Sequence, residues 1–349
     1  MSYSFDDKRL VDWFSKIRRK LPWRDNPTPY GVWISEVMLQ QTQVSVVIPY
    51  FERWMQRFPT VKDLALASHE DVIKQWEGLG YYSRARNLHK GAQYLLETHN
   101  GNIPDNPTEL KKIRGLGPYT IGAILSFAFH KKTVAVDGNV LRVLARYFMI
   151  KDDIYRQKTV GDIRNIAKEI LPDESPWLFN EGLIELGATI CRRTPDCGKC
   201  PVKRSCRSFI NGAANLLPIK SKKNLSIPIY RTVAVIRCGE YVLVQRGKKG
   251  KVMQDLHEFP YFETDEEGMQ PELLIRKISD DFGLGVTPLG TLPIVNHTFT
   301  KFRARLTPYL LKSSERQSLS GFFWLTLQEL DRLAFSSGHK KIYLMLKER

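Results

Sequence analysis

Two carboxylic acids stand in sequence surroundings that suit acid–base chemistry. Glu36 lies inside the otherwise apolar stretch Trp33–Leu39, and Asp137 follows in Val136-Asp137-Gly138-Asn139-Val140. Apolar surroundings raise the pKa of a carboxyl group, so Glu36 suits a general acid near neutral pH. A second acid that stays ionised would complete the pair needed to cleave a glycosidic bond through an oxocarbenium-like state. The alternative for Glu36 is a helix-surface glutamate paired with an arginine.

A glycine hairpin precedes the second of these acids. The run Lys111-Lys-Ile-Arg-Gly-Leu-Gly-Pro-Tyr119 predicts a helix, a tight turn and a second helix that begins at Pro118. We expect Gly115 and Gly117 to supply the backbone conformations of that turn. Their amides and the positive start of the second helix can hold a phosphate oxygen. The hairpin would then present the sugar of a nucleotide to Asp137, although an ordinary turn also fits this pattern.

A second glycine turn carries aromatic and basic residues. It reads Gly78-Leu-Gly-Tyr-Tyr-Ser-Arg-Ala-Arg-Asn87. Tyr81 would insert into a stack of bases while Arg84 and Arg86 contact phosphates. The alternative is a core tyrosine with arginines at the surface.

Four of the five cysteines fall within 16 residues, in the pattern Cys191-x5-Cys197-x2-Cys200-x5-Cys206. Such clustering in a chain without a secretion signal favours metal binding over disulfides. A zinc ion or a [4Fe–4S] cluster fits four thiolates. Zinc modules usually have two paired Cys-x2-Cys knuckles, and only one occurs here, so the spacing favours the iron–sulfur cluster.

The pattern of apolar residues changes along the chain. The first part shows helical spacing over Phe5–Lys20, Trp33–Phe58 (kinked or divided at Pro49), Leu64–Gln75, Tyr82–Glu97, Thr108–Ile113, Tyr119–Phe129, Val140–Phe148, Gly161–Ile170 and Trp177–Ala188. Strands are expected at Arg231–Arg237, Tyr241–Gln245, Leu292–Val295 and Phe302–Leu311, with a helix at Pro271–Phe282. These patterns predict an all-helical domain over 1–208, a linker over 209–227 and a second domain with strands and helices over 228–349.

The bulk composition bounds the kind of partner. The net charge is +16, of which +12 comes from residues 1–227 and +4 from the remainder. A polyanion is the natural partner of such a chain. We expect no membrane span, since no apolar run approaches about 20 residues, and no signal peptide, since the N-terminus is charged.

Taken together, these motifs resemble those of the MutY-type adenine DNA glycosylases, members of the endonuclease III superfamily. The resemblance is densest over residues 8–206. It rests on Leu21-Pro-Trp-Arg, Trp33-Ile-Ser-Glu-Val-Met-Leu-Gln-Gln-Thr-Gln, Gly78-Leu-Gly-Tyr-Tyr-Ser-Arg and Val136-Asp-Gly-Asn-Val. It implies a helix-hairpin-helix glycosylase domain with a [4Fe–4S] loop at 191–206, followed by a Nudix-like domain. It also implies a monomer that acts in the cytoplasm, on the nucleoid, on duplex DNA with adenine opposite 8-oxoguanine or guanine.

The resemblance assigns roles to individual residues. Glu36 would protonate the adenine leaving group, Asp137 would stabilise or attack the sugar cation, and Tyr119 would assist. The base must leave the stack before it can react. The residues that would bind substrate are Trp23, Arg24, Leu39 and Glu181 around the adenine, Gln41, Thr42, Leu79 and Tyr81 in the duplex, and Phe299, Thr300 and Lys301 at the 8-oxoguanine. Relatives that also nick the strand have a lysine where this chain has Tyr119, so the resemblance implies a monofunctional enzyme.

Three departures from the family pattern bear on these expectations. The family usually has six residues between the first two cluster cysteines, and here there are five. Its lesion-reading loop usually runs Phe-Ser-His, and here it is Phe299-Thr300-Lys301. The helix over 273–283 lacks the glutamates that hold metal in a working Nudix hydrolase, so we expect no pyrophosphatase activity.

Two other functions compete with adenine removal. One is an endonuclease III-like glycosylase for oxidised pyrimidines or mismatched thymine, which Tyr119 and the extra C-terminal domain disfavour. The other is a catalytically silent DNA-binding module, which the presence of both Glu36 and Asp137 disfavours.

Overall fold

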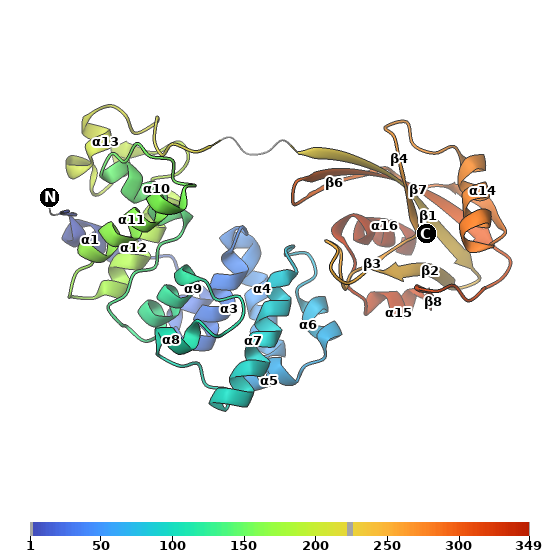
Figure 1. The fold of residues 1–349 in the computed structure, drawn as a ribbon, viewed down its shortest axis with the longest axis horizontal. Helices are drawn as coiled ribbons and strands as arrows, with labels where there is room; N and C mark the ends of the chain where they lie inside the picture. Colours follow the sequence, from blue (N-terminus) through green and yellow to red (C-terminus); the bar gives the residue numbers. More distant parts are fainter. Residues whose placement is uncertain (1–2, 222–225, 349) are drawn as a thin grey trace. The chain divides into compact units, whose positions relative to one another are not determined.

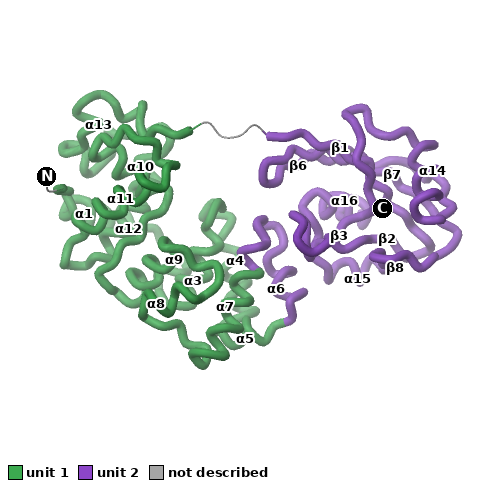
Figure 2. The backbone as a smooth tube through the Cα atoms, viewed as in Figure 1, with its two compact units in different colours: residues 1–67, 86–222 green, residues 68–85, 223–349 purple. Residues whose placement is uncertain are grey.

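The computed structural model describes residues 3–221 and 226–348. The chain divides into two compact units, shown in Figure 2. Unit 1 comprises residues 1–67 and 86–222, and unit 2 comprises residues 68–85 and 223–349. Part of the predicted linker, residues 222–225, lies outside the described residues. The domain bounds 1–208, 209–227 and 228–349 stay a prediction.

Unit 1 is built from helices (Figure 1). The helices are α1 (Asp7–Ile17), α2 (Pro22–Asp25), α3 (Pro29–Leu39), α4 (Val44–Arg57), α5 (Val61–Leu66), α7 (Ser83–His99, which begins in unit 2), α8 (Pro107–Leu110), α9 (Pro118–Ala123), the π-helix η1 (Ile124–Ala128), α10 (Gly138–Tyr147), α11 (Gln157–Glu169), α12 (Pro176–Thr189), the short η2 (Cys197–Lys199) and η3 (Lys203–Ser205), and α13 (Arg207–Ile210).

The buried helix α3 brings Glu36 into the interior of unit 1. Every residue from Tyr30 to Met38 is buried, so this helix is buried on all sides rather than along one stripe. Thr28 caps its N-terminus by accepting a hydrogen bond from the amide of Gly31. A separate core forms where α10, α11 and α12 pack with α1, around side chains such as Leu144 and Phe179.

Two predicted helices of the first part are each divided in the structure. The stretch Trp33–Phe58 forms α3 and α4, and the break falls at residues 40–43, where Gln41 has a φ of +59°. Pro49 lies inside α4 and does not end it. The stretch Leu64–Gln75 is divided between α5 and α6, where Ser68 caps the new helix.

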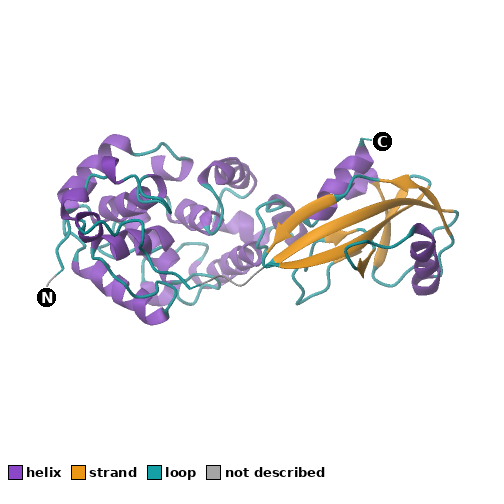
Figure 3. Cartoon of the chain, turned by 90° about the horizontal axis from the view of Figure 1, so that it is seen from above, coloured by secondary structure: helices purple, strands orange, loops and turns teal. Residues whose placement is uncertain are grey.

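Unit 2 holds all the strands of the described chain, drawn in orange in Figure 3. Its elements are α6 (His69–Gln75), β1 (Ile227–Cys238), β2 (Tyr241–Arg246), β3 (His257–Glu258), β4 (Tyr261–Thr264), α14 (Pro271–Phe282), β5 (Val286–Thr291), β6 (Val295–Phe299), β7 (Phe302–Ser313), β8 (Phe322–Thr326), α15 (Leu327–Asp331) and α16 (Ser337–Lys347). The sheet is mixed, in the order β3-β2-β1-β7-β5, and β4, β6 and β8 pair with β1, β7 and β2. The central pair β1 and β7 runs parallel.

Alternating residues of β1 supply two separate cores. Val233 and Val235 pack in a cluster with side chains of α16, whereas Ala234 and Ile236 pack in a cluster with α14. This alternation is expected because successive side chains of a strand point to opposite faces of a sheet. Helices therefore cover both faces of the sheet, and unit 2 combines strands and helices as predicted.

The segment 68–85 belongs to unit 2 through polar contacts. The amine of Lys74 donates to the carbonyl of Leu333 at 2.8 Å, and the carboxylate of Glu77 accepts from the amide of Phe335 at 2.8 Å. No sequence pattern predicted this grouping.

The strand predictions in unit 2 hold for β1, β2 and β7 and are wrong at Leu292–Val295. That stretch is mostly a connection between β5 and β6. Strand β5 was not predicted. Five of its six residues are exposed, so its sequence lacks the alternation of buried and exposed residues by which a strand is recognised. Within the described ranges, no helix has the length and apolar character needed to cross a membrane.

Candidate functional site

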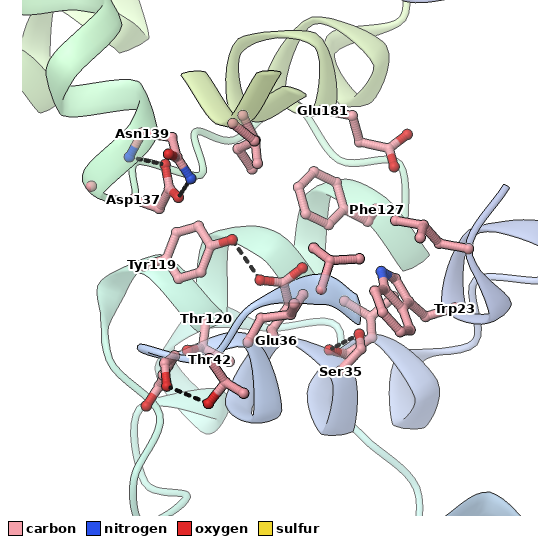
Figure 4. Close-up of a pocket in the computed structure, with 18 of the residues that line it drawn as sticks. Trp23, Ser35, Glu36, Thr42, Tyr119, Thr120, Phe127, Asp137, Asn139 and Glu181 are labelled. Carbon is pink, nitrogen blue, oxygen red and sulfur yellow. Dashed lines mark hydrogen bonds between the residues drawn. The ribbon is translucent and has the colours of Figure 1, made fainter. Parts of the chain in front are cut away.

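One cavity of about 1080 Å³ in unit 1 collects most of the predicted site residues. Figure 4 shows Glu36, Tyr119 and Asp137 there, with Trp23 and Glu181 nearby. The predicted residues that line it are Trp23, Arg24, Glu36, Leu39, Gln41, Thr42, Gly115, Gly117, Tyr119, Asp137 and Glu181. They come from α2, α3, α9, α12, the N-cap of α10 and the loops between these helices.

Glu36 and Tyr119 form a direct hydrogen bond at the cavity. The phenol of Tyr119 donates to Oε2 of Glu36 at 2.5 Å. Burial raises the pKa of Glu36 to about 7, with a smaller rise from Asp137 and an opposing effect of the Tyr119 hydrogen bond. Burial also raises the pKa of Tyr119 well above its usual value, so the phenol keeps its proton and remains the donor. Glu36 is therefore able to exchange a proton near neutral pH.

Asp137 accepts several hydrogen bonds of its own. It caps α10, where its Oδ1 accepts from the amides of Asn139 at 2.9 Å and Val140 at 2.8 Å. Its Oδ2 accepts from the side-chain amide of Asn139 at 2.7 Å. Burial raises the pKa of Asp137, and these three donors oppose that rise. Hydrogen-bond donors stabilise a carboxylate, and Asp137 accepts three such bonds where Glu36 accepts one from the Tyr119 phenol.

An arginine–glutamate network forms one wall of the cavity. Arg24 pairs with Glu181 at 2.9 Å and with Glu185 at 2.9 Å, and its side chain is 9% exposed. Arg18 reaches the second oxygen of Glu181 at 3.1 Å. Arg19 pairs with the fully buried Glu185. Both carboxylates are thus paired, which is what keeps buried charges tolerable.

One of the two glycines in the hairpin has a backbone conformation that requires glycine. Gly115 has a φ of +89°, and a side chain there would meet Cβ of Asn87 at 2.7 Å. Gly117 adopts an ordinary φ of −91°, which other residues also adopt, so the expectation that its conformation needs glycine is wrong. It lines the cavity with open space before it. Arg86 is partly buried on α7.

The four cysteines of the 191–206 loop gather around one small pocket. Cys191, Cys197, Cys200 and Cys206 all line it. A guanidinium nitrogen of Arg146 donates to the Sγ of Cys191 at 3.3 Å. Burial raises the pKa of Cys200 to about 12 and raises that of Cys206. In the described part of the chain, no three potential ligands are arranged as a ready metal site. Four thiols facing one apolar pocket nonetheless fit a group that binds thiolates.

Tyr81 is exposed in the Gly78–Tyr82 turn of unit 2, whereas Arg84, at the start of α7, is buried. Tyr81 is 46% exposed with a φ of +48°. Arg84 is 7% exposed, and its guanidinium donates to the carbonyls of Leu79 at 3.0 Å and Gly80 at 3.1 Å. The structure does not support the predicted contact of Arg84 with phosphate, because the guanidinium is buried and forms hydrogen bonds with carbonyls of the turn. Leu79 is buried as well.

The predicted lesion-reading residues lie at the tip of a hairpin in unit 2. Phe299 ends β6 and pairs with Phe302 of β7, so Thr300 and Lys301 form the turn. Thr300 has a φ of +49°, which is a strained conformation for a β-branched residue. Such strain is concentrated at functional sites.

Comparison with known proteins matches both halves of the chain. Residues 34–173 match the model of the HhH-GPD superfamily of base excision DNA repair proteins, and residues 232–345 match the NUDIX domain. The adenine DNA glycosylase of Rattus norvegicus is 32% identical, over 98% of this chain and 78% of the relative. That of Buchnera aphidicola subsp. Acyrthosiphon pisum is 32% identical, over 97% of this chain and 91% of the relative. The chain belongs to the adenine DNA glycosylase family. The human adenine DNA glycosylase is 33% identical, over 96% of this chain and 72% of the relative.

Solved structures confirm the fold of unit 1. A thermostable thymine-DNA glycosylase superposes with a TM-score of 0.54 and 26% identity, covering 59% of this chain and 95% of that chain. A complex of endonuclease III with DNA superposes with a TM-score of 0.51. Membership of the adenine DNA glycosylase family therefore agrees with the predicted helix-hairpin-helix domain followed by a Nudix-like domain.

Three residues that support Asp137 and the segment before it were not singled out from the sequence. Asn139 holds Asp137, and Arg142 in turn donates to the side-chain oxygen of Asn139 and to the carbonyl of Cys191, both at 2.7 Å. Asn180 bonds the hydroxyl of Ser126 and the carbonyl of Thr133, ahead of Asp137. Asn139 lies in the motif Val136–Val140, two residues after Asp137, and this spacing was the signal that could have identified it. Nothing in the local sequence marks Asn180.

Proposed function

We propose that this chain hydrolyses the N-glycosidic bond of adenine in duplex DNA when the adenine lies opposite 8-oxoguanine or guanine. The observation that carries the proposal is the pair of carboxyls in one cavity, Glu36 bonded to Tyr119 and Asp137 bonded to Asn139. The two groups have different hydrogen-bond environments, which assigns them different protonation states and hence different roles.

Glu36 is the proposed general acid. Its pKa of about 7 leaves a large protonated fraction near neutral pH. A proton delivered to a ring nitrogen of adenine makes the base a better leaving group. The Tyr119 phenol holds one carboxyl oxygen, which leaves the other oxygen for the base. General acid catalysis of this kind contributes roughly 10²–10⁴-fold.

Asp137 is the proposed partner of the sugar. As the base departs, positive charge develops on the sugar, and an adjacent carboxylate either stabilises that charge or bonds to the carbon. Three of the lone-pair positions of Asp137 are occupied by Asn139 and Val140. A carboxylate offers about four such positions, so one remains for the sugar. Water then completes the hydrolysis.

The adenine itself would lie against Trp23, Leu39 and the wall formed by Arg24 and Glu181. A base must be flipped out of the duplex to enter the cavity. Arginine donors and glutamate acceptors on one wall suit the mixed donor and acceptor edge of adenine. Gln41, Thr42, Leu79 and Tyr81 are the proposed contacts with the duplex.

We propose that the strand is left uncut. Cleavage by a glycosylase proceeds through a Schiff base, which needs an amine as nucleophile. Position 119 holds a phenol, bonded to Glu36. The product would be an intact strand with an abasic site.

The Phe299-Thr300-Lys301 turn is the proposed reader of the base opposite adenine. The Thr300 hydroxyl accepts from the protonated N7 that distinguishes 8-oxoguanine from guanine, and its backbone amide donates to a base oxygen. Lys301 attracts phosphates without distinguishing bases.

A [4Fe–4S] cluster is the proposed occupant of the cysteine pocket. Cys191, Cys197, Cys200 and Cys206 would hold it through four thiolates. When bound, the cluster ties the 191–206 loop together. The backbone carbonyl of Cys191 accepts from Arg142, so the same loop supports the residues behind Asp137.

The test is a panel of duplexes containing A opposite 8-oxoguanine, A opposite G, T opposite G, or thymine glycol. Protein in excess is incubated with each, and the products are resolved with and without alkali. We expect adenine release from the first two duplexes and strand breaks only after alkali. Release of thymine instead would overturn the proposal in favour of the activity named for the thymine-DNA glycosylase that unit 1 resembles. Release of thymine glycol would overturn it in favour of an endonuclease III-like glycosylase for oxidised pyrimidines. Breaks without alkali would overturn the absence of strand cleavage.

A further inference from the structure

The backbone of Thr300 is strained, so neighbouring residues must stabilise this conformation of the turn. Thr300 has a φ of +49° between the paired residues Phe299 and Phe302. A β-branched residue rarely adopts this backbone conformation. Strained residues persist only where the surrounding structure determines them from several sides. The carbonyl of Lys301, the other residue of the turn, accepts a hydrogen bond from the amide of Ile227 at 2.8 Å.

An aromatic stack lies along the β6–β7 hairpin next to the turn. The His297 ring lies 5.0 Å from the Phe299 ring at 22° between planes. The Phe299 ring lies 5.5 Å from the Phe302 ring at 43°. The amine of Lys301 lies 5.5 Å from the Phe302 ring. Phe299, which directly precedes Thr300, is thus packed between His297 and Phe302.

Helix α16 packs closely against the His297 ring. A Cβ on Gly338 would lie 2.8 Å from Nδ1 of His297 and 2.7 Å from a methyl carbon of Leu306. Contacts at that distance force a neighbour to move, so only glycine allows α16 to approach the ring this closely. Gly338 is buried near the start of α16.

The Nδ1 edge of the His297 ring packs against its neighbours without a hydrogen bond. Its Nδ1 is buried with no hydrogen-bond partner among the described residues. Burial lowers the pKa of His297, and the nearby Lys341 and Arg231 lower it further, so the ring is neutral. The neighbouring His339 accepts a hydrogen bond from the Phe259 amide and has a pKa lowered to about 3, which keeps it neutral too.

We propose that His297, clamped by Gly338, is a positioning residue that stacks on Phe299 and so holds Thr300 where it meets the base opposite adenine. This inference rests on the proposed function, because it concerns how the proposed reader is presented. His297 acts through Phe299 and does not itself touch the DNA.

The experiment compares kcat/KM for A opposite 8-oxoguanine and for A opposite G in variants of the full chain. His297→Ala removes the stacked ring, and Gly338→Ala pushes that ring aside. Each is expected to narrow the ratio of the two kcat/KM values about tenfold, the order of one lost base contact. His297→Phe keeps a flat ring and loses no Nδ1 hydrogen bond, so it should keep the ratio.

The matched control is Ile278→Ala in α14, which lies in the other core cluster of unit 2. It should lower the melting temperature and leave the ratio unchanged. A simple loss of folded protein lowers both kcat/KM values equally, so the ratio separates positioning from stability. If His297→Ala does not fold, the comparison of the two kcat/KM values is made with Gly338→Ala.

Two results would overturn the inference. One is an unchanged ratio in His297→Ala and Gly338→Ala. The other is a narrowed ratio in His297→Phe, which would mean that the imidazole nitrogens matter and the stack does not. The proposed function fails on a different result, when the unsubstituted chain does not release adenine or does not distinguish the two substrates.

Discussion

The phenol of Tyr119 donates a hydrogen bond to Glu36 across 2.5 Å inside the cavity. Burial favours the protonated carboxyl of Glu36, whereas this hydrogen bond favours the carboxylate. The balance leaves Glu36 with a pKa of about 7, above its usual value and below the value that burial alone would give. Tyr119 therefore tunes the proposed acid as well as orienting it, and this relationship carries the first three predictions.

Replacing Glu36 with glutamine should abolish adenine release and keep binding of the A:8-oxoguanine duplex. The substitution removes the proton donor and preserves the shape of the side chain. General acid catalysis contributes roughly 10²–10⁴-fold, so the single-turnover rate should fall by that order. The rate and the dissociation constant are measured on the same duplex. Near-normal turnover would exclude Glu36 as the acid.

The same Glu36→Gln substitution should stabilise the protein at neutral and alkaline pH. Burial raises the pKa of Glu36 from 4.5 to about 7. Below pH 4.5 the group is protonated in both the folded and unfolded states and costs nothing. Above pH 4.5, Glu36 ionises in the unfolded state but stays protonated in the folded state. The free energy of unfolding therefore falls as the pH rises to about 7, and the loss is constant at higher pH. This difference in pKa corresponds to about 3 kcal/mol.

Urea unfolding of both proteins at several pH values checks this prediction. The unfolding free energy of Glu36→Gln should exceed that of the unsubstituted protein by an amount that grows between pH 4.5 and 7. Other titrating groups cancel in the difference. A difference that does not change with pH would contradict the burial of an ionisable group at this position.

Replacing Tyr119 with phenylalanine should move the pH dependence of adenine release to higher pH. Release needs protonated Glu36, so in the unsubstituted protein the rate should fall above about pH 7. Without the phenol, the carboxylate loses its donor, and the pKa of Glu36 rises. The plateau rate should also fall roughly tenfold, the order of one hydrogen bond worth about 1.4 kcal/mol. A downward shift of the alkaline limb would contradict this account.

The sequence predicted the acids because their chemistry is local to their neighbours. Glu36 stood among apolar residues of one helix, and that helix is buried on all sides. Asp137 stood before a helix start, where an aspartate caps the helix by bonding its first amides. In both cases the property that matters follows from a few adjacent residues.

Other features depended on contacts that local sequence does not encode. The side chain of Arg84 donates to two carbonyls of the preceding turn, so an arginine that was expected to contact phosphate is buried. The break between α3 and α4 falls at Gln41 rather than at Pro49, because a residue with positive φ ends a helix that the apolar pattern continues. The role of Gly338 depends on β6, some 40 residues earlier in the chain.

Purified protein should be brown and contain about four irons per chain, as a cubane cluster on four thiolates requires. Cys197→Ser should lower the iron content, since Cys197 lines the pocket with the other three thiols. Cys238→Ser is the matched control, because Cys238 lies on β1 in unit 2. Iron and zinc are measured on protein prepared without oxygen. Stoichiometric zinc and no iron would refute the cluster.

The last prediction divides the work of the reading turn between Thr300 and Lys301. Thr300→Ala should narrow the ratio of A:8-oxoguanine to A:G activity about tenfold, because it removes a hydroxyl that accepts from N7–H. Alanine is not β-branched, so this substitution should not increase the strain at a φ of +49°. The melting temperature should therefore hold while the ratio falls.

Lys301→Ala should instead weaken binding of both substrates by similar factors. A lysine that meets one phosphate adds about −0.9 to the slope of log K against log salt, so the slope should flatten by about that amount. The amine of Lys301 lies over the Phe302 ring, and no acid within the described residues pairs with it, so its charge is available to DNA. The ratio of the two activities should not change. If Lys301→Ala removes only the preference for 8-oxoguanine and leaves the salt slope intact, the lysine itself reads the lesion and this division is wrong.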